Sequence, residues 1–204
     1  MLSFFDTQAK QIFIGNILFV ICCVFYLMWW LLAFKPSGAI TGIKTGWLLI
    51  PASLSGLAGV VVALLGIAAK TPDTRLFPGE YVLWGGIAAF IVLLAVTAWL
   101  FKRPATAELP LIVGWGMFAL AGVNALFGLG LFSHRLSIGF ILIIAAAVLI
   151  SLICYVLYYH LDKRAGYIDG MIPLLLAVLT MAGISVSTAY IGATQIINSC
   201  CKRY

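Results

Sequence analysis

Charged side chains are scarce in this sequence: Asp, Glu, Lys and Arg make up 9% of the 204 residues, whereas hydrophobic residues make up 64%. Soluble domains carry about 25% charged and about 45–50% apolar residues, so a water-soluble fold of this size cannot hide so much apolar surface. Disordered chains are polar and rich in charge, which excludes that class as well. The composition predicts an integral membrane protein whose main partner is the lipid bilayer.

Signatures of catalysis and of metal binding are also lacking. The chain has two histidines and five cysteines, and they form neither a zinc-binding spacing nor a Cys-x-x-Cys redox motif. The sequence contains no Gly-x-Ser-x-Gly, His-Glu-x-x-His or phosphate-binding glycine loop. We therefore expect a protein that is not an enzyme, holds no metal or cofactor and does not bind nucleic acid.

What the sequence has instead is six uncharged stretches of 21 to 32 residues, the shortest between Glu80 and Lys102 and the longest between Asp169 and Lys202. A helix needs about 20 apolar residues to cross a membrane, whereas barrel strands need about 9–11 and alternate polar with apolar residues. We therefore predict an all-α integral membrane fold in which residues 1–204 form a single membrane domain. The six transmembrane helices are expected at 12–34, 46–69, 81–101, 109–132, 136–159 and 170–198.

Six spans form three consecutive hairpins and leave the N- and C-termini on the same side of the membrane. We call the opposite side, which holds the loops 36–45, 102–108 and 160–169, side A. Lys and Arg near the helix ends normally set the orientation, but six of them fall on each side, so the orientation stays open. The expected location is the plasma membrane, or the inner membrane of a bacterium, and the first helix is expected to be retained as a span.

Tryptophan is concentrated toward side A. Five of the six tryptophans are expected near that boundary: Trp29, Trp30, Trp47, Trp99 and Trp115. Indole rings favour the membrane–water interface, and basic residues lie just beyond it. The stretch "WWLLAFKP" at 29–36 is therefore typical of an interfacial anchor followed by the end of a helix.

Ionisable groups inside a span are the strongest sign of function in a membrane protein. Here all of them are expected in loops or at helix ends. Asp162 and Asp169 share a stretch with Lys163 and Arg164 that is typical of a solvated turn. Ion-coupled carriers usually need a carboxylate within the membrane, so coupled transport is disfavoured.

Neutral polar residues do enter the spans. In the last helix a row of residues spaced by three or four shares one face: Thr180, Gly183, Ser187, Tyr190, Thr194 and Asn198. Hydroxyl and amide groups that faced lipid would lack partners, so we expect this row to face inward. The candidate path-lining residues are Thr180, Ser187, Tyr190 and Thr194 of this helix, Asn124 of the fourth and Asn16 of the first.

A neutral hydroxyl and amide lining suits a small uncharged or weakly polar solute. We therefore expect a channel or a facilitative transporter, either alone or as a homo-oligomer. Small and hydroxylated residues also pack membrane helices against one another. The alternative is thus a non-catalytic membrane subunit that binds partner helices through its small-residue faces. A second alternative is a small intramembrane enzyme that modifies lipid headgroups on side A.

Overall fold

The computed structural model describes residues 7–35, 45–68, 76–100 and 108–201, and these residues are helical apart from short turns. The six α-helices and two 3-10 turns follow in the order α1 (Thr7–Ala33), η1 (Thr45–Leu48), α2 (Leu49–Ala68), α3 (Gly79–Leu100), α4 (Glu108–Gly128), α5 (His134–Leu157), η2 (Tyr158–His160) and α6 (Lys163–Cys201). No strand occurs in the described ranges, so the predicted all-helical class is confirmed. Some residues used to weigh the orientation, among them Lys44, Lys70 and Lys102, lie outside the described ranges.

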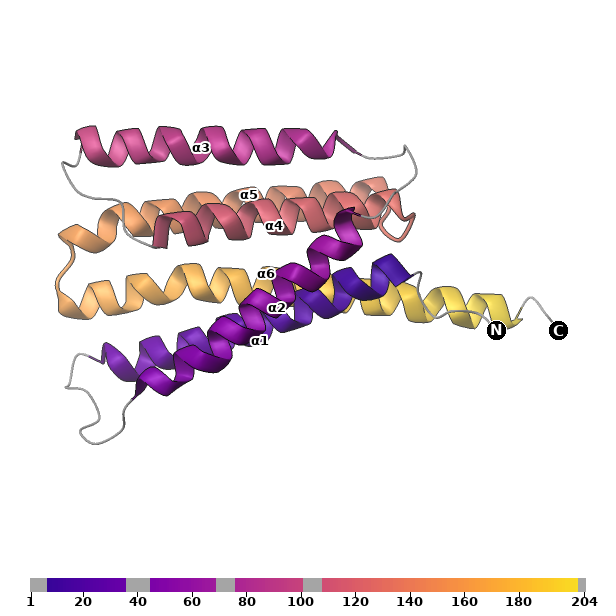
Figure 1. Cartoon of the computed structure of the whole chain (residues 1–204), viewed down its shortest axis with the longest axis horizontal. Helices are drawn as coiled ribbons and strands as arrows, with labels where there is room; N and C mark the ends of the chain where they lie inside the picture. Colours follow the sequence, from indigo (N-terminus) through magenta and orange to yellow (C-terminus); the bar gives the residue numbers. More distant parts are fainter. Residues whose placement is uncertain (1–6, 36–44, 69–75, 101–107, 202–204) are drawn as a thin grey trace.

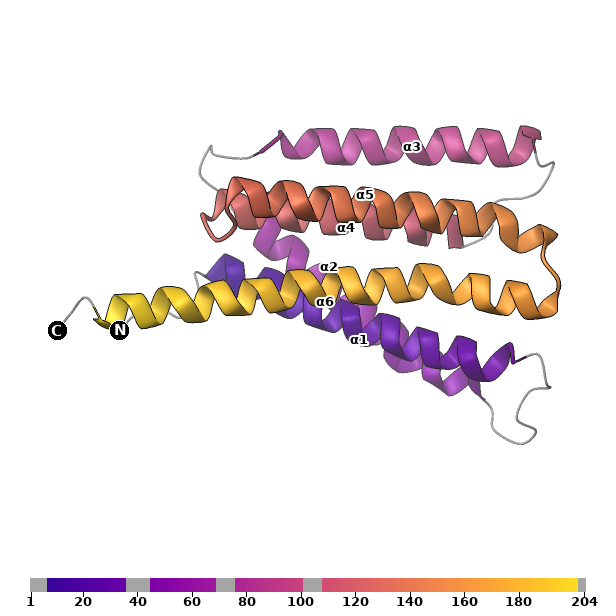
Figure 2. The ribbon, with the colours of Figure 1, turned by 180° about the vertical axis from the view of Figure 1, so that it is seen from behind.

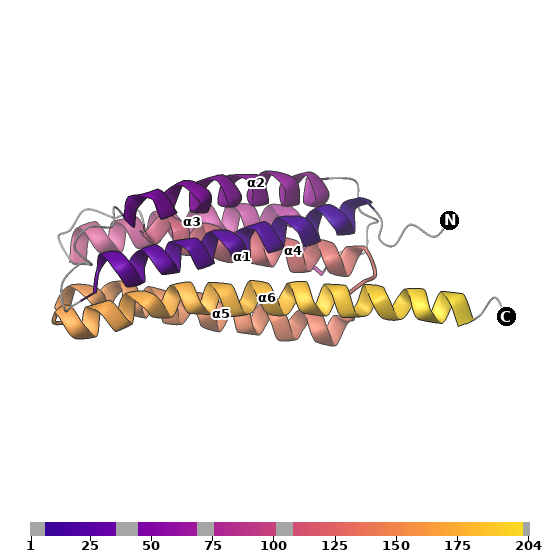
Figure 3. The same cartoon turned by 90° about the horizontal axis from the view of Figure 1, so that it is seen from below.

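The helices form an elongated bundle in which successive helices run in opposite directions (Figure 1). Seen from behind, α5 and α6 lie in front of α4 and α1, so the bundle has two layers (Figure 2). From below, α2 lies on the face opposite α5 and α6 (Figure 3). At the side A end, α1, α3 and α5 finish and α2, α4 and α6 start. The 39 residues of α6 reach about 58 Å, and its last turns project beyond the other helices.

Helix α4 is the centre of the bundle. In its most apolar stretch 61% of the residues are buried, against 22–28% in the corresponding stretches of α1, α2, α5 and α6. Large apolar side chains are exposed on every α-helix, as expected where hydrocarbon surrounds the protein. By length and composition these five helices can cross a membrane, and α3 contains a shorter apolar stretch, Trp84–Val96. These features are consistent with an integral, multi-pass membrane protein.

Glycine allows α1 and α2 to cross at close range. A Cβ atom added to Gly15 of α1 would lie 2.5 Å from the Ala63 Cβ and 2.7 Å from the Gly59 carbonyl oxygen of α2. A Cβ added to Gly59 would lie 2.9 Å from the Gly15 carbonyl oxygen. Small residues at such a crossing let membrane helices gain dispersion energy over a long contact. The oblique α1–α2 pair in Figure 1 depends on this contact.

Five of the six tryptophans divide into two groups, and Trp29 is half-buried. Trp47, Trp84 and Trp99 are 56–81% exposed, as anchors at the membrane surface would be. Trp30 and Trp115 are only 8% and 6% exposed and belong to the interior. The prediction that Trp30 serves as an interfacial anchor is therefore wrong, because α6 begins earlier than expected and packs against this ring.

Candidate functional site

The predicted row on α6 does not coincide with the inward face of that helix. Buried residues of α6 follow one another at helical spacing as Ala177, Thr180, Met181, Ile184, Ser185, Thr188 and Gly192. Of the predicted row, Thr180 is buried, Ser187 and Thr194 are half-buried, and Tyr190 is 72% exposed. The row therefore runs from the interior to the outer surface of the bundle instead of following one buried face.

Several hydroxyl groups along the helices are bonded to their own helix. Ser185 donates to the Met181 carbonyl oxygen at 2.8 Å, and Thr188 donates to that of Ile184 at 2.7 Å. Thr194 of the predicted row donates in the same way to the Tyr190 carbonyl oxygen at 2.8 Å. A hydroxyl that is satisfied in this way can face packed side chains or lipid without a solute or water.

The two asparagines lie at other contacts. Asn124 of α4 is buried and bonded to the segment before α3: its Nδ2 donates to the Phe77 carbonyl oxygen at 2.9 Å, and its Oδ1 accepts from the Leu76 N–H at 3.1 Å. Asn16 is buried on α1, next in sequence to Gly15. None of the six candidate residues lines either of the two cavities described below.

A carboxyl group lies where none was expected. Helix α6 begins at Lys163, seven residues before the predicted start at 170, because Asp162 caps it. The Asp162 carboxylate accepts from the Ala165 N–H at 2.8 Å, as an N-cap residue does. Asp169 consequently lies inside the helix and is only 8% exposed. The prediction that Asp162 and Asp169 share a solvated turn is therefore wrong for Asp169.

One oxygen of Asp169 is unused. Its Oδ2 atom is buried and has no hydrogen-bond partner among the described residues. The Cys154 thiol of α5 is a hydrogen-bonding neighbour of the same carboxyl group. A buried polar atom without a partner costs roughly 1–3 kcal/mol, and more if it is charged. Such an atom calls for an explanation, and an unfilled binding site is one.

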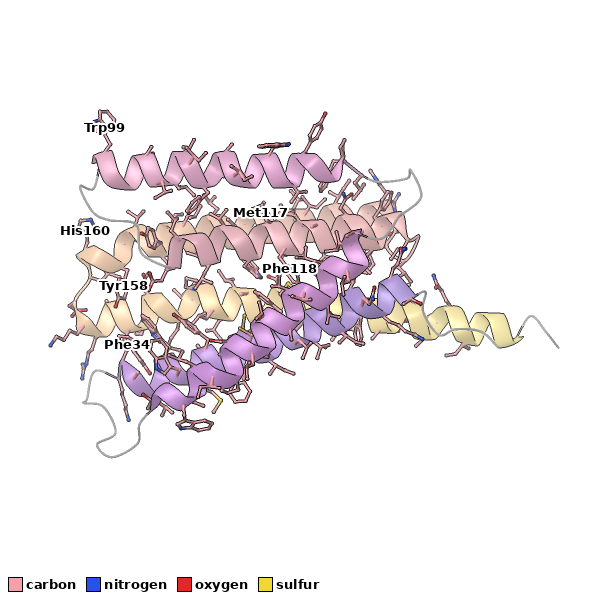
Figure 4. The ribbon with its side chains drawn as sticks, in the orientation of Figure 1. Phe34, Trp99, Met117, Phe118, Tyr158 and His160 are labelled. Carbon is pink, nitrogen blue, oxygen red and sulfur yellow. The ribbon has the colours of Figure 1, made fainter. Side chains whose placement is uncertain are left out.

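Asp169 lines a cavity of about 220 Å³ at the side A end of the bundle, which we call the anionic pocket. Its walls come from α1, α4, α5, η2 and α6. Glu108, the first residue of α4, is exposed at the same cavity. The aromatic lining consists of Tyr26, Trp30, Phe34, Tyr155 and Tyr158. Figure 4 labels Phe34 and Tyr158 at this end of the bundle, and the ring of each lies against that of Trp30.

The Trp30 ring holds α1 against the beginning of α6. Its Nε1 donates to the Tyr167 carbonyl oxygen at 3.2 Å, and the Tyr167 hydroxyl donates back to the Leu31 carbonyl oxygen at 3.1 Å. Trp30 stacks on Phe34 with 4.4 Å between the ring centroids. A Cβ atom added to Gly170 would collide with the Trp30 indole. Glycine at 170 therefore lets the ring lie directly beside Asp169.

The chemistry of the anionic pocket suits a cation. Both charged side chains that line it, Asp169 and Glu108, are carboxylates, and no Lys or Arg is present among its described lining residues. Aromatic faces attract cations through their quadrupole, by about 0.5–2 kcal/mol each. Within the described ranges no group of three or more His, Cys, Asp and Glu side chains is arranged to hold a metal ion. The pocket is therefore better suited to an organic cation than to a metal.

Sequence reasoning missed Asp169, Cys154, Glu108 and Trp30 as members of one site. A signal was available in "AGYIDGMIP" at 165–173, where Gly166 and Gly170 lie one helical turn apart and flank the acid. Small residues at that spacing favour close helix packing rather than a loop.

Comparisons of the chain with protein-family models, with curated proteins and with solved structures find no match.

Proposed function

We propose that this protein is a six-span integral membrane carrier that binds a small organic cation in the anionic pocket and lets it cross without catalysis. The six uncharged stretches and the alternating helix directions support six spans with both termini on one side (Figure 1). The observation that carries the proposal is the buried Asp169 carboxyl, with its free oxygen in an aromatic pocket. A buried ionisable side chain in a membrane bundle often marks a substrate or ion pathway.

The proposed solute differs from the uncharged one that the sequence favoured. That expectation depended on the neutral hydroxyl and amide groups along α6, whereas the anionic pocket is lined by the carboxyl groups of Asp169 and Glu108. A facilitative carrier still requires only that the solute bind and leave on either side. The bonding of Thr188 and Thr194 to their own helix carbonyls supports a carrier with a defined binding site over an open path along α6.

The binding energy has two sources of known size. Two opposite charges 4 Å apart attract by about 4 kcal/mol at the effective dielectric constant of a protein surface. Desolvation of the cation offsets part of this attraction, and aromatic faces such as Trp30 add to it. We expect loss of the Asp169 charge to weaken cation binding about 10- to 100-fold, which corresponds to about 1.4–2.8 kcal/mol.

The experiment compares Asp169→Asn with Asp162→Asn. Each variant is purified, and binding is measured in nanodiscs of phosphatidylcholine, with uptake of radiolabelled tetramethylammonium in liposomes as a second readout. The ligands are radiolabelled tetramethylammonium, which tests the charge, and methylammonium, whose N–H groups can also donate to the free Asp169 oxygen. An amide in place of either carboxyl group keeps the shape of the side chain, and asparagine is as good a helix cap as aspartate. We expect D169N to lose binding and uptake, whereas D162N behaves as wild type. Equal binding by wild type and D169N, or no binding by folded wild type, would refute the proposal.

The path along α6 is tested in the same liposomes with glycerol as a neutral solute. Ser187→Leu alters the middle of the predicted row without touching the anionic pocket. We expect S187L to leave tetramethylammonium uptake unchanged. Glycerol flux through wild type that disappears in folded S187L would instead support a hydroxyl-lined path, as the sequence alone suggested.

A further inference from the structure

A second cavity lies along α4, toward the middle of the bundle. It has a volume of about 480 Å³ and is bordered by α1, α2, α3 and α4. Most of its lining is aliphatic or aromatic, including Phe19, Val60, Leu64 and Phe118. None of its lining residues carries a charge. We call this cavity the apolar groove.

The apolar groove and the anionic pocket are neighbours that share one lining residue, Leu111 of α4. From Leu111 the groove follows α4 as far as Ala121. Ten residues of helix rise about 15 Å. One leaflet occupies half of the ~30 Å hydrocarbon core, so the groove matches the depth of a single acyl chain. The anionic pocket lies at the side A end of the bundle, where headgroups would lie.

The walls of the groove can adapt to a chain. Figure 4 shows Met117 pointing toward α3 and Phe118 pointing toward the crossing of α1 and α2. The Met117 side chain packs tightly against Gly86 of α3. Methionine is flexible and fills irregular spaces. Among the described helices α3 packs against α4 alone, so the outer wall of the groove is held at one interface.

Resting on the proposed cation carrier, we infer that its ligand is a single-chain cationic amphiphile, an alkylamine or alkylammonium of about one leaflet's length. The ammonium head lies beside Asp169 in the anionic pocket, and the chain passes Leu111 into the apolar groove. Because the charges lining the pocket are both carboxylates, a phosphate in the head would be repelled. A phospholipid head therefore fits this pocket poorly, whereas a simple amine fits it.

The test separates binding in the groove from partition into lipid. Gly114 lines the groove, and a Cβ atom at this position would meet nothing within 4 Å, so Gly114→Leu fills the groove without a clash in the backbone. Gly85→Leu of α3 is the matched control, because Gly85 is exposed and equally open. Partition into the nanodisc is the same for all variants and is subtracted with empty discs.

Binding of tetramethylammonium, dodecyltrimethylammonium and lysophosphatidylcholine is measured for wild type, G114L, G85L and D169N. We expect G114L to weaken binding of the dodecyl compound at least about tenfold and to leave binding of tetramethylammonium unchanged. G85L should change the binding of neither ammonium compound, and D169N should weaken the binding of both. Lysophosphatidylcholine should bind to the wild type more weakly than the dodecyl compound does.

The outcomes distinguish this inference from the proposed function. If tetramethylammonium binding depends on Asp169 but binding of the dodecyl compound is unaffected by G114L, the inference of an amphiphilic ligand is wrong and the proposed cation carrier stands. If neither ammonium compound depends on Asp169, both proposals fail. Equal binding of lysophosphatidylcholine and the dodecyl compound would overturn the exclusion of phosphate, and with it the amine class of the ligand.

Discussion

Replacing Asn124 by leucine tests whether the buried polar residues of this protein serve packing or a solute. Asn124 is 3% exposed on the most buried helix, and its amide makes two hydrogen bonds to the chain segment before α3. Leucine has a similar volume and no polar atom. The substitution therefore removes both bonds with little change in packing.

The size of the effect follows from these two bonds. A hydrogen bond contributes about 0.5–1.5 kcal/mol in soluble proteins, and between membrane helices the average is about 0.6 kcal/mol. The change also leaves the Leu76 N–H and the Phe77 carbonyl without their Asn124 partner. Both residues are half-buried, so water relieves part of that cost. We expect the free energy of unfolding to fall by about 1–3 kcal/mol.

The matched control is Ser185→Ala. Ser185 is 1% exposed, and its hydroxyl donates within its own helix to the Met181 carbonyl oxygen at 2.8 Å. That carbonyl keeps its backbone partner in the variant, so we expect a loss below about 0.5 kcal/mol. Unfolding by sodium dodecyl sulfate in mixed micelles, followed by circular dichroism, measures both variants. Equal effects of N124L and S185A, or an N124L protein as stable as wild type that no longer passes solute, would refute the reasoning.

Two further predictions concern the contacts of α1. Trp30→Phe keeps an aromatic ring in place but removes the 3.2 Å hydrogen bond to the Tyr167 carbonyl oxygen. We expect the affinity for tetramethylammonium, measured by titration, to fall about two- to fivefold. Unchanged affinity would show that the bond does not position the ring for binding. Gly59→Ile drives a side chain into the α1 backbone, and we expect the free energy of unfolding in the same micelle assay to fall by about 1–3 kcal/mol. Gly46→Ile serves as the tolerated control, because a Cβ atom at Gly46 would meet nothing within 4 Å.

The helical class follows from composition because the bilayer leaves few alternatives. Lipid offers no hydrogen bonds to an exposed backbone, so a long uncharged stretch is forced to form a helix whatever its side chains. For this reason the spacing between charges located the helices well, even where local propensities are weak. Helix ends are less constrained, since water and side-chain caps compete there, and the early start of α6 at Asp162 was missed.

The register of the buried face of α6 is harder to predict than the helix itself. In a soluble helix the polar side faces water, but both sides of a membrane helix are apolar or small. Residues such as Ser185 and Thr188 are as small and as hydroxylated as Ser187 and Thr194, and only the position of α5 and α1 decides which of them is buried. Tryptophan poses the same problem. Trp30 and Trp99 each lie near the end of a helix that finishes at side A, yet Trp30 is buried and Trp99 is exposed.

Polar groups in this bundle differ in how much of their bonding capacity is already used. Thr188 and Thr194 bond to their own helices, and Asn124 bonds to a neighbouring segment. Asp169 keeps a buried oxygen without a partner, and Cys154, the polar neighbour of its carboxyl group, is a weak donor. A buried carboxyl oxygen without a partner gains most from a ligand, whereas the hydroxyls of Thr188 and Thr194 have already used their single donor. This difference is invisible in the sequence, where a threonine row is more conspicuous than one acid at a helix start. The Trp115 Nε1 atom is also buried without a partner among the described residues, but Asp169 can carry a charge, and for this reason we propose the binding site there.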